Sequence, residues 1–335
     1  MYYKTMFLAS LMTGTLIAIS SYSWMGMWMG LEINLLSIIP LMSSIKNMMA
    51  SEAALKYFIS QALASTILMF SIIMMSLNLG YNLNFNLYLT LMLNTSLFLK
   101  MGAAPFHYWF PEVMEGLTWL MSMMMLTWQK IAPMILLTYF SYSSTYLILI
   151  IIFCMLISGL MGLNQTSMRK ILAYSSINHI GWMLSTLLIM ETLWLYYFVI
   201  YSVITVNIIF AMKIFNIFHQ KQLFISMNFN YLMKFFFILN FLSLGGLPPF
   251  LGFLPKWITI QTLIKNQMFL MSTLMIIMTL MTLYFYLRVT FTTLLLKTNE
   301  ITFFNQIPLN KSLMLMINFI SLISLILSTL MFNFM

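Results

Sequence analysis

Four charged side chains stand in the middle of apolar segments and are the first candidates for chemistry. They are Glu32, Lys100, Lys130 and Lys256. A charge at membrane depth costs about 2.5–3.5 kcal/mol on insertion scales, so such a charge is a functional candidate. Lysine titrates near pH 10.4 in water, and desolvation can lower a lysine pKa by about 3–5 units, into the range of proton exchange near neutral pH. Static buried ion pairs are the alternative, but one carboxylate cannot neutralise three lysines.

Prolines cluster around the three lysines. Six of the eight prolines lie within eleven residues of one of these lysines: Pro105, Pro111, Pro133, Pro248, Pro249 and Pro255. Proline lacks an N–H group, so it interrupts a helix and leaves a backbone carbonyl without its partner. An interrupted helix beside a buried charge is a way in which transporters build ion sites.

Two histidines are further candidates, with weaker support. His107 follows Pro105 by two residues, and His179 shares one face of a predicted helix with Ser175, Asn178, Trp182 and Thr186. A polar stripe of this kind must face the protein interior or a hydrated cavity. Each histidine could relay protons near neutral pH. A buried, hydrogen-bonded histidine without a transport role is the alternative for both.

The composition predicts an all-α polytopic membrane protein. Of 335 residues, 62% are hydrophobic and 6% are charged, and the mean hydropathy is +0.97. A soluble domain has roughly a quarter of its residues charged, so this chain could not build a water-exposed surface. The single Cys154 excludes disulfides and cannot hold an iron–sulfur cluster, and no glycine-rich dinucleotide motif is present. We therefore expect no cofactor and no metal in this chain.

Apolar stretches predict about eleven transmembrane helices in a single domain over residues 1–335. The spans are 5–22, 24–45, 52–77, 86–115, 117–140, 145–163, 170–190, 192–218, 231–264, 267–296 and 312–332. Spans four and nine are long and contain Gly and Pro. We expect a first five-helix unit over 5–140 with a break near 101–105, a second over 145–296 with a break near 245–256, and a C-terminal helix. The two long spans are five positions apart, and this odd offset predicts that the two units are inverted repeats.

Basic residues predict the topology. With this span count, one side of the membrane holds the N-terminus and a set of seven basic residues, and the other side holds only Lys265; the seven are Lys4, Lys46, Arg169, Lys170, Lys221, Lys297 and Lys311. The positive-inside rule then puts the N-terminus on the side of synthesis, the matrix in a mitochondrion. The net charge of +9 thus reflects topology, and we expect no nucleic-acid partner.

The methionine content indicates an organellar origin. The chain has 37 Met and no Asp, as expected of an AT-rich organellar genome, although adaptable packing by Met explains part of the excess. We expect no transit peptide, because the first residues lead directly into an apolar helix.

Five segments carry a resemblance to a known family. They are GLEIN (30–34), LKMGAAPFHYW (99–109), WQKIAP (128–133), LAYSSINHIGW (172–182) and LGGLPPFLGFLPKW (244–257). Together they resemble the antiporter-like chain 2 family of mitochondrial NADH:ubiquinone oxidoreductase, respiratory complex I. The methionine-rich composition is similar to that of insect members.

The resemblance implies a membrane-arm subunit of complex I. Its expected function is proton translocation across the mitochondrial inner membrane, coupled to electron transfer from NADH to ubiquinone. By the family pattern, Glu32 and Lys100 form a mobile ion pair and Lys130 relays the proton. Lys256 lies on the exit side or couples to a neighbouring subunit. NADH, FMN, iron–sulfur clusters and ubiquinone are expected in partner subunits, so this chain contributes to an enzyme without holding its redox chemistry. Expected partners are other membrane-arm and accessory subunits and the lipid bilayer.

Two other functions stay open on the motifs. A free-standing cation/proton antiporter of the related multisubunit type would use the same helices. A purely structural membrane scaffold is disfavoured by the central lysines.

Overall fold

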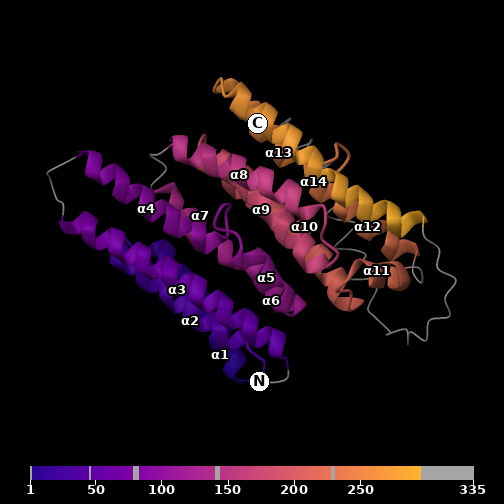
Figure 1. Cartoon of the computed structure of the whole chain (residues 1–335), viewed down its shortest axis with the longest axis horizontal. Coiled ribbons are helices and arrows are strands. Elements are labelled where there is room, and N and C mark those ends of the chain that lie inside the picture. Colours follow the sequence, from indigo (N-terminus) through magenta and orange to yellow (C-terminus); the bar gives the residue numbers. More distant parts are fainter. Residues whose placement is uncertain (1, 45–46, 78–82, 140–143, 228–230, 296–335) are drawn as a thin grey trace, which may run out of the picture. The chain divides into compact units, whose positions relative to one another are not determined.

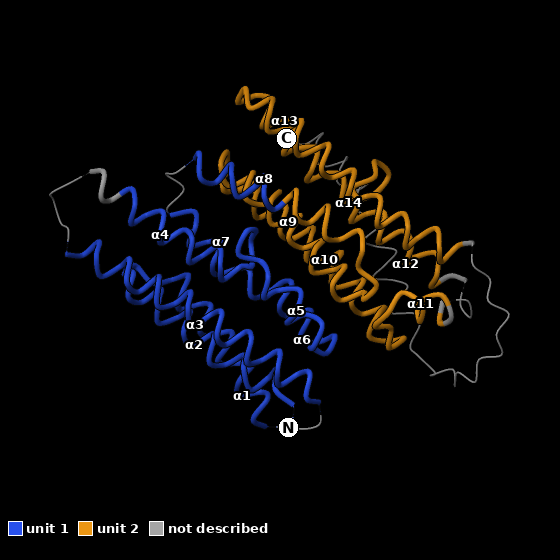
Figure 2. The backbone as a smooth tube through the Cα atoms, viewed as in Figure 1, with its two compact units in different colours: residues 1–154 blue, residues 155–335 orange. Residues whose placement is uncertain are grey.

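The computed structural model describes residues 2–44, 47–77, 83–139, 144–227 and 231–295. Regular secondary structure in these ranges is helical, apart from one isolated bridge between Ser167 and His219. The chain divides into two compact units, residues 1–154 and 155–335 (Figure 2). The predicted helix over 312–332 lies outside the described residues, as do Lys46, Lys297 and Lys311.

The part of the first unit that the structure describes contains seven helices and the beginning of an eighth. They are α1 (Tyr2–Ser20), α2 (Trp24–Met42), α3 (Met48–Leu77), α4 (Leu83–Met101), α5 (Trp109–Gly116), α6 (Trp119–Leu126), α7 (Trp128–Thr138) and α8 (Ser144–Gly162). Helix α2 packs on α1 and α3, and α4 packs on α3 and α7 (Figure 1). Small residues allow the α1–α2 contact: a side chain on Gly30 would collide with the backbone of Ala18. Glu32, Lys100 and Lys130 lie on α2, α4 and α7; α3 packs on both α2 and α4, and α7 packs on α4.

In its described residues, the second unit contains the remainder of α8 and six further helices. They are α9 (Met168–Leu187), α10 (Glu191–Ile214), α11 (Gln220–Met227), α12 (Tyr231–Gly245), α13 (Phe253–Lys265) and α14 (Phe269–Leu295). Helix α10 contacts α9, α12 and α13, and α14 contacts α9, α11, α12 and α13. This packing places the half-helices α12 and α13 against common neighbours.

Both predicted helix interruptions are present. The fourth span divides into α4 and α5 around residues 102–108, and the ninth divides into α12 and α13 around 246–252. Each first half ends at a glycine with positive φ, 71° at Gly102 and 81° at Gly246. In both turns the glycine N–H and the next N–H bond back to the final turn of the helix, which is the Schellman motif. Pro105 lies beyond this turn, so glycine ends the helix where the sequence pattern suggested proline.

Helix ends differ from the predicted spans by a few residues, and two of the differences have a visible local cause. The fifth span is divided at Thr127 into α6 and α7, because the Thr127 hydroxyl donates to the carbonyl of Met123 at 2.8 Å and bends the helix. The eighth span ends early, at Ile214, because Asn216 adopts a φ of 50° and closes the helix. The short helix α11 that follows was not predicted.

Within the described residues, six helical segments are long and apolar enough to cross a membrane. They are Trp24–Met42, Met48–Leu77, Trp119–Thr138 (α6 and α7 taken together), Ser144–Gly162, Glu191–Ile214 and Phe269–Leu294, with shorter apolar helices over Leu87–Met101 and Met233–Gly245. Large hydrophobic side chains such as Leu16 and Tyr196 are more than 60% exposed, as lipid-facing side chains would be. The polytopic all-α class is confirmed, and the count of eleven crossings stays a prediction.

Candidate functional site

Lys100 is a buried cation in the last turn of α4. The residue is 8% exposed, and its Nζ atom has no hydrogen-bond partner. The final carbonyls of α4 are bonded by other side chains. Trp109 Nε1 donates to the Leu99 carbonyl at 3.1 Å, and Gln61 Nε2 donates to the Lys100 carbonyl at 3.4 Å. The ammonium group is thus not needed to cap its own helix.

A small polar cavity adjoins Lys100. Its volume is about 20 Å³, and it is lined by Leu31, Asn34, Leu35, Tyr57, Gln61, Lys100, Gln129 and Pro133. A cavity needs roughly 10–15 Å³ and two to four polar partners to hold one water molecule. The amides of α2, α3 and α7 and the lysine supply such partners, so the cavity suits a water molecule beside Lys100.

Glu32 lies on α2 and acts electrostatically on Lys100. Its Oε1 atom is buried and has no hydrogen-bond partner. Lys100 Nζ has no hydrogen-bond partner either, so the two residues do not form a direct hydrogen bond. The structure thus holds the predicted pair within electrostatic reach but apart, and the proposed movement between them stays a prediction.

Lys130 is buried in the first turn of α7. The side chain is 1% exposed, and Nζ lies 5.8 Å from the centre of the Phe110 ring, within the range of a cation–π interaction. Pro133 follows within the same helix and cannot donate to the carbonyl of Gln129. The association of lysine and proline predicted here is therefore present inside a short helix.

Asn34 and Gln129 are functional candidates that the sequence prediction omitted. Asn34 Nδ2 donates to Gln129 Oε1 at 3.1 Å, and Gln129 Nε2 donates to Asn34 Oδ1 at 2.9 Å. Asn34 follows Glu32 by two residues, and Gln129 precedes Lys130 directly. The signal that could have identified them is an amide beside a buried charge in an otherwise apolar helix, where a polar group needs a partner.

The first unit also places His107 in the interruption between α4 and α5. His107 is 2% exposed, and its Nδ1 lies 3.3 Å from the carbonyl of Pro105. Its ring packs on that of Tyr108 with centroids 4.5 Å apart. These contacts fit a structural role as well as a relay, so the relay stays a prediction.

Lys256 and His179 belong to the second unit. Lys256 Nζ donates to the carbonyls of Leu244 at 3.2 Å and Gly245 at 2.9 Å. His179 Nδ1 lies 2.9 Å from the hydroxyl of Tyr197, and Asn178 donates to the hydroxyl of Thr282 at 3.1 Å.

The residues of the predicted polar stripe on α9 form two kinds of hydrogen bond. His179 and Asn178 reach neighbouring helices, whereas Ser175 and Thr186 donate to carbonyls of their own helix. Residues 171–187 are all buried, so the stripe faces protein.

Clusters of metal-ligating side chains were sought in the part of the chain that the structure describes. No group of three or more His, Cys, Asp and Glu residues in these ranges could hold a metal ion. The chemistry that the described residues offer is proton binding and release by lysine, glutamate and histidine.

Comparison with known proteins identifies the family. A model described as "NADH:quinone oxidoreductase/Mrp antiporter, TM" matches residues 21–282. NADH-ubiquinone oxidoreductase chain 2 of Locusta migratoria is 47% identical over 92% of this chain and 90% of its own length. The Anopheles gambiae protein of the same name is 47% identical over 99% of this chain and 98% of its own. The chain belongs to the NADH-ubiquinone oxidoreductase chain 2 family.

Chains in solved structures have a fold similar to that of this member of the chain 2 family. A chain of respiratory complex I from Thermus thermophilus aligns with a TM-score of 0.86 and 22% identity, over 96% of this chain and 77% of the other. A chain of the Mrp complex from Dietzia sp. aligns with a TM-score of 0.77 and 16% identity, over 87% and 60%. The antiporter-like fold predicted from the sequence is confirmed.

Proposed function

We propose that this chain 2 family member is a membrane-arm subunit of respiratory complex I that translocates protons across the mitochondrial inner membrane. Electron transfer from NADH to ubiquinone drives the translocation, and partner subunits carry the redox cofactors. The proposal rests on the membership of the family and on apolar helices that suit a multi-pass membrane protein. The basic residues favour an N-terminus in the matrix.

The observation that supports proton handling is the setting of Lys100. A buried ammonium with no hydrogen-bond partner, beside a cavity large enough for water and within reach of a carboxylate, can exchange its proton with little rearrangement. We propose that Glu32 controls the charge of Lys100 and that Lys130 receives the proton next. His107 and His179 are proposed as secondary relays. Lys256, whose ammonium donates to two backbone carbonyls, is proposed to lie on the exit side of the pathway or to couple to a neighbouring subunit.

A second candidate is a cation/proton antiporter that functions outside a respiratory complex. The fold likeness to the Mrp complex chain fits this candidate, but the high identity over nearly the full length is to NADH-ubiquinone oxidoreductase chain 2. Proton uptake that follows a sodium or potassium gradient and does not need NADH would favour the antiporter.

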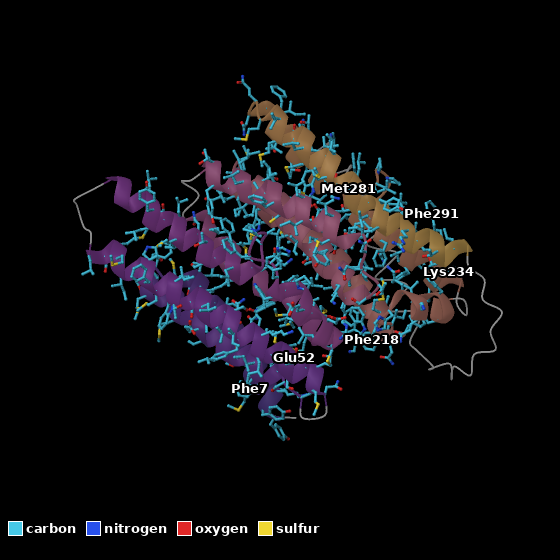
Figure 3. All side chains as sticks on the ribbon, viewed as in Figure 1. Phe7, Glu52, Phe218, Lys234, Met281 and Phe291 are labelled. Carbon is cyan, nitrogen blue, oxygen red and sulfur yellow. The ribbon has the colours of Figure 1, made fainter. Side chains whose placement is uncertain are left out.

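The test compares Lys130→Met with Lys56→Met in the assembled complex. Lys130 is buried, whereas Lys56 has a side chain that is 43% exposed and bonded to Glu52 at 3.0 Å and Glu112 at 2.9 Å. Glu52 lies near the start of α3 (Figure 3). Both changes remove one ammonium and keep a similar side-chain volume, so they separate position from charge.

We expect Lys130→Met to lower the number of protons taken up per NADH, with assembly intact on native gels. Lys56→Met is expected to leave that ratio unchanged, because the Lys56 ammonium is exposed and its ion pairs are screened by solvent. An assembled Lys130→Met complex with an undiminished ratio would refute the proposal.

A further inference from the structure

Two tyrosines from one face of α10 contact the imidazole of His179. Tyr197 and Tyr201 lie four residues apart on this helix, so their side chains share a face. The Tyr197 hydroxyl lies 2.9 Å from Nδ1 of His179, and the Tyr201 ring packs on the imidazole with centroids 4.9 Å apart. Helices α9 and α10 pack against each other within the second unit (Figure 1). The imidazole is therefore held in one orientation by a hydrogen bond and a ring contact.

These three side chains are shielded from their surroundings. His179 is 4% exposed, Tyr197 is 1% exposed and Tyr201 is 2% exposed. A hydrogen bond between buried partners is stronger than the same bond in water. Tyr196, which precedes Tyr197 directly, points away from this cluster and is 61% exposed. Burial alone suits a purely structural histidine, so the nitrogen that Tyr197 occupies decides what else the imidazole can do.

Tyr197 occupies one of the two imidazole nitrogens. A protonated imidazole donates from both nitrogens, and a phenolic oxygen can accept one of these bonds. If the proton then leaves from Nε2, Nδ1 keeps its hydrogen and the bond to the phenol is unchanged. Loss of the proton from Nδ1 would instead require the phenolic hydrogen to turn towards the imidazole. The bond at one ring nitrogen thus favours proton exchange at the other.

Helices α10, α13 and α14 all pack on α9, and each carries a buried ionisable side chain. Tyr201 of α10 forms a side-chain hydrogen bond with Ser176 of α9. Tyr286 of α14 interacts electrostatically with Tyr197 and Tyr201. Lys256 lies in the first turn of α13. Tyr197 makes the direct bond to the imidazole, whereas the hydroxyl of Tyr201 is bonded to a serine.

We propose that Tyr197 is a positioning residue for proton transfer by His179. Its hydroxyl oxygen accepts a hydrogen bond from Nδ1–H and confines the gain and loss of a proton to Nε2. Tyr197 itself neither gains nor loses a proton in this role, and Tyr201 supports the imidazole by packing. The inference deepens the proposed function, because it rests on the relay role of His179.

A double-variant cycle in the assembled complex tests this role. Tyr197→Phe removes one hydroxyl and keeps the ring, and Tyr196→Phe makes the same change at the exposed neighbour. We expect Tyr197→Phe to slow NADH-driven proton uptake about tenfold, the order of one hydrogen bond to a charged group, and Tyr196→Phe to leave the rate unchanged. In a His179→Gln background, Tyr197→Phe should slow uptake no further, because the hydroxyl acts only through the imidazole.

A hydroxyl with a purely structural role gives different results. Equal fold losses from Tyr197→Phe in both backgrounds would overturn the proposal. A lower dissociation temperature on native gels with unchanged uptake would overturn it as well. Since the change removes a single oxygen atom, failure of the Tyr197→Phe complex to assemble would show a structural role and have the same consequence.

A second comparison separates the hydrogen bond from the ring contact. Tyr201→Phe keeps the ring that packs on the imidazole and removes the hydroxyl bonded to Ser176. Positioning by Tyr197 predicts a smaller loss of uptake from Tyr201→Phe than from Tyr197→Phe. An equal or larger loss from Tyr201→Phe would overturn the proposal.

Failure of the proposed function gives another pattern. If the chain does not translocate protons, Lys130→Met leaves uptake unchanged together with all the tyrosine and histidine variants. If only the relay role of His179 fails, Lys130→Met slows uptake, whereas His179→Gln and Tyr197→Phe do not. If the relay holds and the positioning fails, His179→Gln slows uptake and Tyr197→Phe does not.

Discussion

The side-chain amides of Asn34 and Gln129 form a reciprocal pair between α2 and α7. Each amide donates to the other, at 3.1 and 2.9 Å, and both residues border the cavity beside Lys100. The pair thus connects the helix of Glu32 to the helix of Lys130. An amide cannot gain or lose a proton near neutral pH, so its role is to set the spacing of the residues that can.

Breaking this pair on one side should destabilise the first unit. Asn34→Leu leaves the Gln129 amide without its partner, which costs about 1–3 kcal/mol for a buried polar group. The double variant Asn34→Leu/Gln129→Leu should cost less than the sum of the single variants, because no orphaned amide remains. Thermal dissociation of the assembled complex measures the three effects. Strict additivity would show that the two amides do not act as a pair.

The glycines at the end of α12 should differ sharply in their tolerance of alanine. Gly246→Ala places a side chain at a φ of 81° and against Lys256. Strain at positive φ costs about 1–2 kcal/mol before any crowding. Gly245→Ala is the matched control, because the nearest atom to its Cβ would be 3.7 Å away in ordinary contact. We expect only the first variant to lower the dissociation temperature, and similar losses in both would argue against a special packing role of Gly246.

The indole cap of α4 can be isolated by comparing two tryptophans. Trp109 Nε1 donates to the Leu99 carbonyl, whereas Trp128 Nε1 is buried without a partner. Trp109→Phe should therefore cost about 0.5–1.5 kcal/mol more than Trp128→Phe, the net value of one hydrogen bond. The difference in dissociation temperature is the relevant measurement. A larger loss from Trp128→Phe would contradict the capping role.

A relay role for His179 predicts a selective loss of proton uptake. His179→Gln keeps hydrogen-bonding groups near the Tyr197 hydroxyl but removes the titrating imidazole. We expect fewer protons taken up per NADH with normal assembly, and no change for His219→Gln, where the side chain is exposed. Normal uptake in the His179 variant would leave this histidine with the structural role alone.

Amino-acid pattern alone was sufficient for the fold class and for most helices. Backbone groups in lipid must bond within the segment, so a chain with 6% charged residues has few options other than helices. Glycine and proline marked both interruptions to within a few residues, because their backbone preferences are local. The division at Thr127 and the short helix α11 were missed, since a hydroxyl bonded to its own helix leaves no change in hydropathy.

The tertiary structure decided what each buried lysine contacts. Lys100, Lys130 and Lys256 look equivalent in the sequence, each near a proline in an apolar segment. Only packing shows that Lys256 caps α12 while Lys100 has no hydrogen-bond partner. Packing likewise shows that Asn34 and Gln129, which are 95 residues apart, bond to each other. Sequence period fixes which residues share a helix face, but the rotation and neighbours of each helix depend on contacts between segments remote in the chain.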